Sequence, residues 1–213
     1  MVDTATPMFP LESTLLPDED LPLRIFEPRY SQLVADCLVG DPVFGVVLIA
    51  AGREVGGGED RYDVGTLARI VEHQAYRDGR YLLRCRVGER IRVRRWLADD
   101  PYPRAVVEPW PDEPGDVVTD AAIRRLQDRV LGLFERLATA RGGQLPPPDM
   151  LFAGVAMAES PGQSLYALAS RIPMGQADRY AVLSAPSAAD RLHAVSEAID
   201  TVAAMVEFQL SGE

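Results

Sequence analysis

The hydrophobic pattern of this chain changes its period once, near residue 112, and this change limits the possible folds more than any other feature. Before it, short runs of alternating apolar and polar residues are separated by Gly, Pro and Asp, as in β-strands. After it, apolar residues recur every three or four positions, as in amphipathic helices. The sequence therefore predicts an α+β protein, with a mostly antiparallel β-barrel or sandwich over residues 1–112 and an α-helical bundle over residues 113–213.

Within the β-rich part, residues 21–30 predict a strand that runs directly into a helix. The apolar residues of the strand alternate with Pro22 and Arg24: Leu21, Leu23 and Ile25. Pro22 favours an edge strand, since proline cannot donate a ladder hydrogen bond. Glu27 and Pro28 suit a helix start, and Gly40 suits its end. The predicted helix carries one apolar face, formed by Tyr30, Leu33, Val34, Cys37 and Leu38.

Further strands are expected on both sides of this helix. The predicted segments are Met8–Leu11, Val43–Ala51, Val64–Glu72, Tyr81–Val87, Ile91–Trp96 and Tyr102–Trp110. Asp78 and Gly79 predict a tight hairpin turn. Gly88 and Glu89 predict a second turn, so that Ile91 would begin a new strand.

A proline-rich polar linker, Pro111–Asp116, precedes the helical part. Five helices are expected: from Thr119 to Gly142, Asp149–Glu159, Ser164–Ile172, Ala177–Leu183, and a last one that begins at Ser187. Ser187 and Asp190 have the spacing of a capping box. The first and last helices share a 3-4 apolar spacing, which favours an antiparallel pair within one chain. A homodimeric coiled coil would show the same spacing, so the chain is expected to be a monomer or a homodimer.

All 22 basic residues of the chain are arginine, and lysine is absent. A Walker A loop needs a lysine on the ATP phosphates, and Ser-Lys peptidases and pyridoxal-phosphate enzymes need one as well. These classes are therefore excluded for this sequence, and no ATP binding is expected. The net charge of −10 also disfavours broad binding to nucleic acid or to anionic membranes.

Arginine is concentrated between residues 80 and 96. The arginines of this stretch are Arg80, Arg84, Arg86, Arg90, Arg92, Arg94 and Arg95. Most alternate with apolar residues, which predicts a solvated hairpin face whose charges pair with acidic side chains elsewhere. An acidic protein partner would suit this face. RNA binding through Arg84, Arg86 and Arg92 is the alternative.

No metal site, cofactor site or nucleophilic triad is predicted. His73 and His193 have no cysteine or carboxylate partners at metal-ligand spacing, and no G-x-S-x-G motif is present. Cys37 and Cys85 each lie in an apolar pattern and are expected to be buried thiols in a reducing compartment. With no signal peptide and no membrane-length apolar run, a cytoplasmic protein is expected.

Several motifs, in this order, resemble the N-terminal substrate-binding domain of Lon proteases. They are Phe9-Pro10-Leu11, Leu21-Pro22-Leu23-Arg24-Ile25-Phe26-Glu27-Pro28-Arg29-Tyr30, Phe44-Gly45-Val46-Val47-Leu48, Val64-Gly65-Thr66-Leu67-Ala68-Arg69-Ile70, Asp78-Gly79-Arg80 and Gly88-Glu89-Arg90-Ile91. The resemblance is closest to stand-alone bacterial proteins of this family. Where the family often has a Phe-Pro-Gly turn, this chain has Leu16-Pro17-Asp18-Glu19-Asp20.

The resemblance implies a PUA-like β pseudobarrel followed by a helical bundle. It also implies a non-catalytic module that binds unfolded or specific polypeptides, as an adaptor or regulator of proteolysis. The signature residues are expected to be mainly structural: Leu23, Phe26, Glu27, Pro28, Arg29, Tyr30 and Gly65. Phe26 or Tyr30 could anchor a peptide if exposed, but buried positions between strand and helix are favoured for both.

Overall fold

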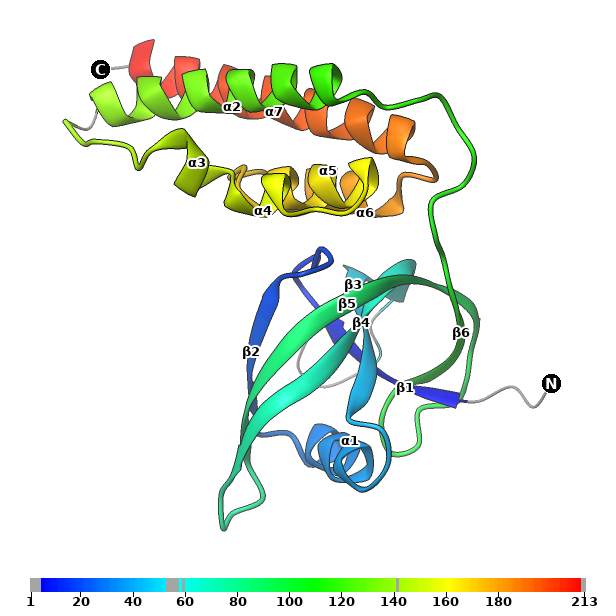
Figure 1. Ribbon diagram of the computed structural model, residues 1–213. Coiled ribbons are helices and arrows are strands. Elements are labelled where there is room, and N and C mark those ends of the chain that lie inside the picture. The colour runs from blue at the N-terminus through cyan, green and yellow to red at the C-terminus, as the bar shows by residue number, and fades with distance from the viewer. Residues whose placement is uncertain (1–4, 53–57, 59, 141, 212–213) are drawn as a thin grey trace. The chain divides into compact units, whose positions relative to one another are not determined.

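The computed structural model describes residues 5–52, 58, 60–140 and 142–211, and the chain divides into two compact units. Unit 1 is Met1–Pro111 and unit 2 is Asp112–Glu213. We call them the barrel unit and the helical unit. Their elements, in chain order, are drawn in Figure 1. None of the described helices is both long enough and apolar enough to cross a membrane.

Six strands form the described part of the barrel unit. They are β1 (Ala5–Leu11), β2 (Asp20–Ile25), β3 (Val43–Ala51), β4 (Asp60–Ala75), β5 (Tyr81–Trp96) and β6 (Arg104–Pro109). Their order is β2-β5-β4-β3-β1-β6, and β6 also pairs with β5, so the sheet closes on itself (Figure 1). β1 and β3 are parallel, and the other pairs are antiparallel. The predicted mostly antiparallel barrel is confirmed.

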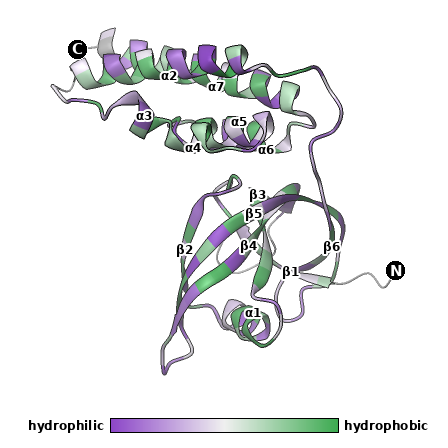
Figure 2. Cartoon of the chain, viewed as in Figure 1, coloured by the Kyte–Doolittle hydropathy of each residue, from purple (hydrophilic) through white to green (hydrophobic). Residues whose placement is uncertain are grey.

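The turn predicted at Gly88 and Glu89 is wrong, because β5 runs through both residues. In the register with β4, Thr66 pairs with Arg90 and Ala68 with Val87, so two residues of β5 face one of β4. This is a β-bulge, which reverses the side-chain alternation beyond it. Hydropathy alternates along β5 in Figure 2. Before the bulge the inward residues are Leu83, Cys85 and Val87, and after it Ile91 and Val93 join a second cluster.

One helix, α1 (Pro28–Val39), closes the larger of the two barrel cores. Pro28 stands at its first position, and the Gly40 N–H donates to the Asp36 carbonyl at its end, as predicted. Its buried residues are Tyr30, Leu33, Val34 and Cys37. The Tyr30 ring stacks on Phe9 of β1 with the ring centroids 4.2 Å apart. The predicted apolar face is confirmed, although Leu38 is only partly buried.

Over its described residues, the helical unit has two long helices and four short ones. They are α2 (Asp120–Ala140), α3 (Pro148–Leu151), α4 (Ala153–Ala156), α5 (Pro161–Ala169), α6 (Gln176–Ser184) and α7 (Ala188–Ser211). The helix predicted over 149–159 is wrong, because Phe152, with φ −111° and ψ 21°, separates α3 from α4. The third helix begins earlier than predicted, because the Ser160 hydroxyl caps it by accepting from the Gln163 N–H.

The prediction that the two long helices are antiparallel is also wrong. Arg129 of α2 pairs with Asp200 of α7, and Arg136 pairs with Glu207, with both pairs 71 residues apart in sequence. Because the contacts advance together along both helices, α2 and α7 run parallel (Figure 1). The segments from α3 to α6 follow α2 in sequence and return the chain to the end at which α7 begins. A 3-4 spacing defines the buried face of a helix but not the direction of its partner.

Arginine side chains hold the first two residues of the predicted linker, each within its own unit. On the barrel side, Arg90 donates from Nη2 to the Pro111 carbonyl at 3.3 Å. On the helical side, the fully buried Arg191 donates to both carboxylate oxygens of Asp112, at 3.0 and 2.6 Å, and stacks on the Tyr166 ring. The backbone N–H of Glu113 donates to the Pro186 carbonyl.

Candidate functional site

The strand-to-helix junction is held by contacts among the signature residues themselves. Glu27 and Arg29 form an ion pair at 3.2 Å with only 17% of each side chain exposed. The Arg29 guanidinium lies over the Tyr30 ring, 4.3 Å from its centroid. Tyr30 is 2% exposed. These three residues therefore fix the angle between β2 and α1, while Leu23 packs half-buried against the core.

Gly65 lets β3 and β4 approach each other closely. A Cβ atom placed on it would lie 2.1 Å from the Val46 carbonyl oxygen and 2.7 Å from Val47 Cγ1. No side chain fits at these distances without separating the two strands. We therefore assign Gly65 a packing role in the sheet.

Phe26 is exposed, so the favoured buried position is wrong for this residue and holds only for Tyr30. Its side chain is 59% exposed, beside Ile25, which is 2% exposed. In an extended strand, successive side chains point to opposite sides, so an inward Ile25 directs Phe26 outward. Among the signature residues, Phe26 thus presents a large apolar group to solvent.

The arginine-rich strand is largely neutralised by acidic side chains of the same unit. Arg84 pairs with Glu72 across β5 and β4, and its hydrogen bond holds the pKa of Glu72 below the usual value. Arg86 pairs with Asp20 at 3.3 Å. The Arg92 guanidinium lies over the Trp110 ring, 3.6 Å from the centroid. For Arg84 and Arg86, the predicted pairing with acids is confirmed.

Arg90 departs from the predicted solvated face, because the bulge turns it inward. It is 5% exposed, lies over the Trp110 ring and donates from Nε to the Trp110 carbonyl. Its role is to hold the end of β6.

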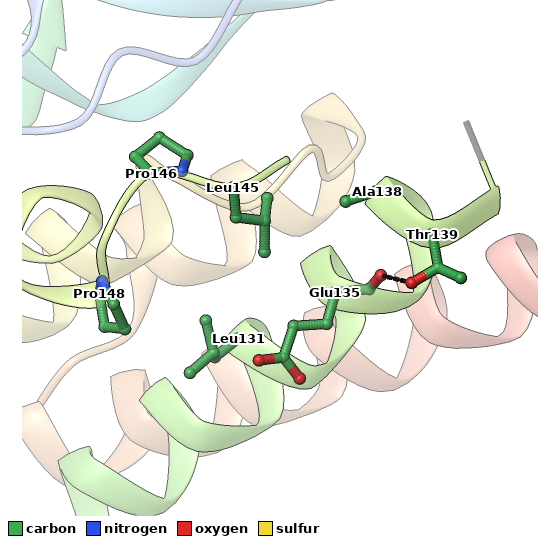
Figure 3. Close-up of a pocket in the computed structure, with 7 residues that line it drawn as sticks. All are labelled: Leu131, Glu135, Ala138, Thr139, Leu145, Pro146 and Pro148. Atoms are coloured by element: carbon green, nitrogen blue, oxygen red, sulfur yellow. Dashed lines mark hydrogen bonds between the residues drawn. The ribbon is translucent and has the colours of Figure 1, made fainter. Parts of the chain in front are cut away.

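The helical unit contains a surface hollow that the sequence did not predict. It has a volume of about 240 Å³ and lies between the second half of α2 and the proline segment before α3 (Figure 3). Its apolar lining includes Leu131, Leu145 and Pro148, and Glu135 is its charged residue. The apolar run around Pro146 is visible in the sequence and could have indicated an apolar surface. The run by itself does not predict that α2 lies beside it.

Metal-ligating side chains are not gathered in the described part of the chain. No set of three His, Cys, Asp or Glu residues there could hold a metal ion. Cys37 and Cys85 are buried free thiols, as predicted. Burial raises the pKa of Cys37 to about 11 and that of Cys85 to about 12, so both are poor nucleophiles at neutral pH.

Comparison with known proteins places this geometry in a family. The family model of the ATP-dependent protease La (LON) substrate-binding domain matches residues 5–201. The chain belongs to the LON substrate-binding domain family. Related proteins include Lon protease 1 of Herpetosiphon aurantiacus, 27% identical over 90% of this chain, and Lon protease 2 of Thermus thermophilus, 26% identical over 98%. The chain spans 24% and 26% of the length of these two proteases.

Solved LON domain structures have the same fold. The Lon N-terminal domain protein from Xanthomonas campestris superposes with a TM-score of 0.60 at 27% identity, covering 89% of this chain and 95% of that one. The N-terminal domain of Mycobacterium avium complex Lon protease gives a TM-score of 0.62 at 13% identity over 92% and 98% of the two chains. At that identity the second match speaks for the fold alone.

Proposed function

We propose that this chain is a non-catalytic module that binds unfolded or specifically tagged polypeptides and acts as an adaptor or regulator of proteolysis. The observation that carries the proposal is the match of the LON substrate-binding domain family to residues 5–201. The absence of lysine supports a non-catalytic role, because a Ser-Lys peptidase or a P-loop cannot be built from these 213 residues. Two buried free cysteines fit a cytoplasmic location.

Phe26 is our candidate contact on the barrel unit. It lies after β2, which pairs with β5 alone among the described strands. That strand edge is a poor template for strand addition, because Pro22 lacks an N–H and Arg24 is charged. Capture through the exposed aromatic side chain is therefore the better-supported mode on this face.

RNA binding through Arg84, Arg86 and Arg92 finds less support. The first two arginines are paired with Glu72 and Asp20, and the third stacks on Trp110. RNA would have to displace these ion pairs before its phosphates could bind. The net charge of −10 opposes the approach of another polyanion.

The proposal can be tested with a permanently unfolded protein, such as reduced and carboxymethylated lactalbumin, and its native form. We expect the full chain to bind the unfolded form and not the native one in fluorescence anisotropy. Phe26→Ala should weaken this binding about fivefold, since it removes an apolar contact that is buried in the complex. A fluorescent single-stranded RNA of similar mass should not bind at physiological salt.

Val39→Ala is the matched control, because Val39 is 91% exposed at the other end of α1. Its affinity should equal that of the unaltered chain. Failure of the unaltered chain to bind the unfolded protein would overturn the proposal. Salt-sensitive RNA binding that is lost in Arg84→Ala would favour the alternative instead.

A further inference from the structure

The α3–α4 region presents an apolar surface to solvent on the side opposite its core contacts. Within residues 145–158, Asp149 is the one polar side chain. Phe152 and Val155 are buried, whereas Met150 is 67% and Met157 82% exposed. The exposed alanines beside them are Ala153 and Ala156. A surface helix normally turns a polar face outward, so this arrangement indicates an interaction surface.

Along the chain, this apolar segment directly follows the residues that line the hollow of Figure 3. Pro148 lines the hollow and is also the first residue of α3, two positions before Met150. We call the whole the α2–α4 surface. It comprises Leu131, Glu135, Leu145, Pro146, Pro148, Asp149, Met150, Ala153, Met157 and Glu159. At about 240 Å³ the hollow is smaller than a site for a drug-sized ligand, and its size suits a single side chain.

All the charge on the α2–α4 surface is negative. The sequence contains no basic residue between Arg141 and Arg171. Glu135 lines the hollow, and Asp149 and Glu159 flank the methionines. Among the residues that the structure describes, these three carboxylates have no ion-pair partner, unlike Asp200 and Glu207, which pair with arginines of α2.

We propose that the α2–α4 surface binds polypeptide segments in which apolar residues are flanked by arginine or lysine. The proposal rests on the proposed function and adds which client sequences are preferred. Met150 and Met157 adapt their shape to different apolar side chains. An arginine or lysine stem lies along Leu131 and Pro148 in the hollow, and its charge meets the Glu135 carboxylate. A second copy of this chain is disfavoured as the occupant, because two copies of charge −10 repel each other.

The test uses two fluorescent peptides with the same Leu- and Phe-containing centre, one flanked by arginines and the other by glutamates. We expect the full chain to bind the arginine peptide about tenfold more tightly at low salt, with the difference shrinking as salt rises. The double variant M150S/M157S should lose about tenfold affinity for the arginine peptide. E135Q should reduce the preference for arginine over glutamate about threefold while retaining binding.

Met205→Ser is the matched control, because Met205 is 47% exposed on α7 and lies outside the α2–α4 surface. Equal affinity of M150S/M157S and M205S would overturn the proposal, and so would equal binding of the two peptides. In either case, retained binding of unfolded lactalbumin leaves the proposed function standing. Light scattering completes the test: a dimer that M150S/M157S dissociates would show that a second copy occupies the surface and would overturn the proposal.

Discussion

Phe26 and Tyr30 belong to the same sequence signature but differ in their surroundings, because one points away from the barrel core and the other into it. Tyr30 stacks on Phe9 and beneath Arg29, so its substitution would disturb the fold. Phe26 is 59% exposed and can change without opening the core. A signature read from sequence alone therefore mixes residues that pack in the core with a residue that is exposed to solvent.

At Gly65, the expected effect of a substitution is structural. Gly65→Ala should destabilise the chain by about 3 kcal/mol, because its Cβ would collide with the Val46 carbonyl, 2.1 Å away, and overpacking of this kind is costly. Urea unfolding followed by circular dichroism measures the loss. Gly88→Ala is the control, since its Cβ would lie 3.5 Å from the Leu67 carbonyl, an ordinary contact. Equal stability of the two variants would contradict the packing role of Gly65.

The sequence predicted the roles of residues that act through local interactions, but not those of residues that act through tertiary contacts. Local patterns placed the buried face of α1, its start at Pro28 and the capping box of Ser187 and Asp190, whose reciprocal hydrogen bonds are present. The exposure of Phe26 and the burial of Arg90 were missed. Both depend on tertiary contacts, in one case the orientation of β2 and in the other a bulge that reverses the alternation along β5.

At the scale of elements, pairing direction and strand continuity were the hardest features to predict. A glycine followed by a charged residue is typical of a turn, yet Gly88 and Glu89 continue β5, which pairs with β2, β4 and β6. The apolar spacing within α2 and α7 predicts which face of each helix is buried, but it does not predict the direction in which the two helices pair. That direction depends on the length of chain between them. The hollow in the α2–α4 surface depends on α2 lying beside the proline segment before α3, which is a tertiary placement, and it was therefore missed.

The clamp between the linker and α7 gives a prediction about element packing. Asp112→Ala should destabilise the chain by about 4 kcal/mol, because it leaves the fully buried Arg191 guanidinium without its carboxylate. Thermal and urea unfolding measure this change. Asp200→Ala breaks a more exposed pair with Arg129 and should cost less than about 1 kcal/mol.

A second variant shows whether the uncompensated charge is the cause. Adding Arg191→Met to Asp112→Ala should recover part of the lost stability, since an apolar pair leaves no buried charge. If Asp112→Ala is no more damaging than Asp200→Ala, the clamp does not stabilise the helical unit.

For the whole molecule, the absence of lysine makes the response to alkaline pH unusually simple. Arginine stays charged throughout the accessible range, so cysteine and tyrosine are the side chains that titrate between pH 9 and 11. Burial raises the pKa of Cys37 to about 11 and that of Cys85 to about 12. Burial and the hydrogen bond to Asp36 raise the pKa of Tyr102 to about 12.

These raised pKa values predict a loss of stability at high pH. The stability that the buried neutral thiols provide is fully present below about pH 8.5, where the thiols are neutral in both the folded and the unfolded chain. Above that pH the unfolded chain loses protons that the folded chain keeps, so each thiol lowers the unfolding free energy by about 1.4 kcal/mol per pH unit. The double variant C37A/C85A should show a flatter decline in urea unfolding between pH 9 and 11. Identical slopes would contradict the assignment.

The parallel course of α2 and α7, together with the clamp at their start, determines how the helical unit bears a pulling force. Arg191 lies in the first turn of α7 and holds Asp112, and the Glu113 N–H donates to the Pro186 carbonyl just before α7. Tension between residue 112 and the end of α7 therefore passes first through this ion pair and this hydrogen bond, and then along α7. The helices from α2 to α6 lie outside this load path. Once both contacts break, the load moves to α2 and shears the α2–α7 seam. The Arg129–Asp200 and Arg136–Glu207 ion pairs then bear the load at the same time. In an antiparallel helix pair, the ion pairs would break one after another.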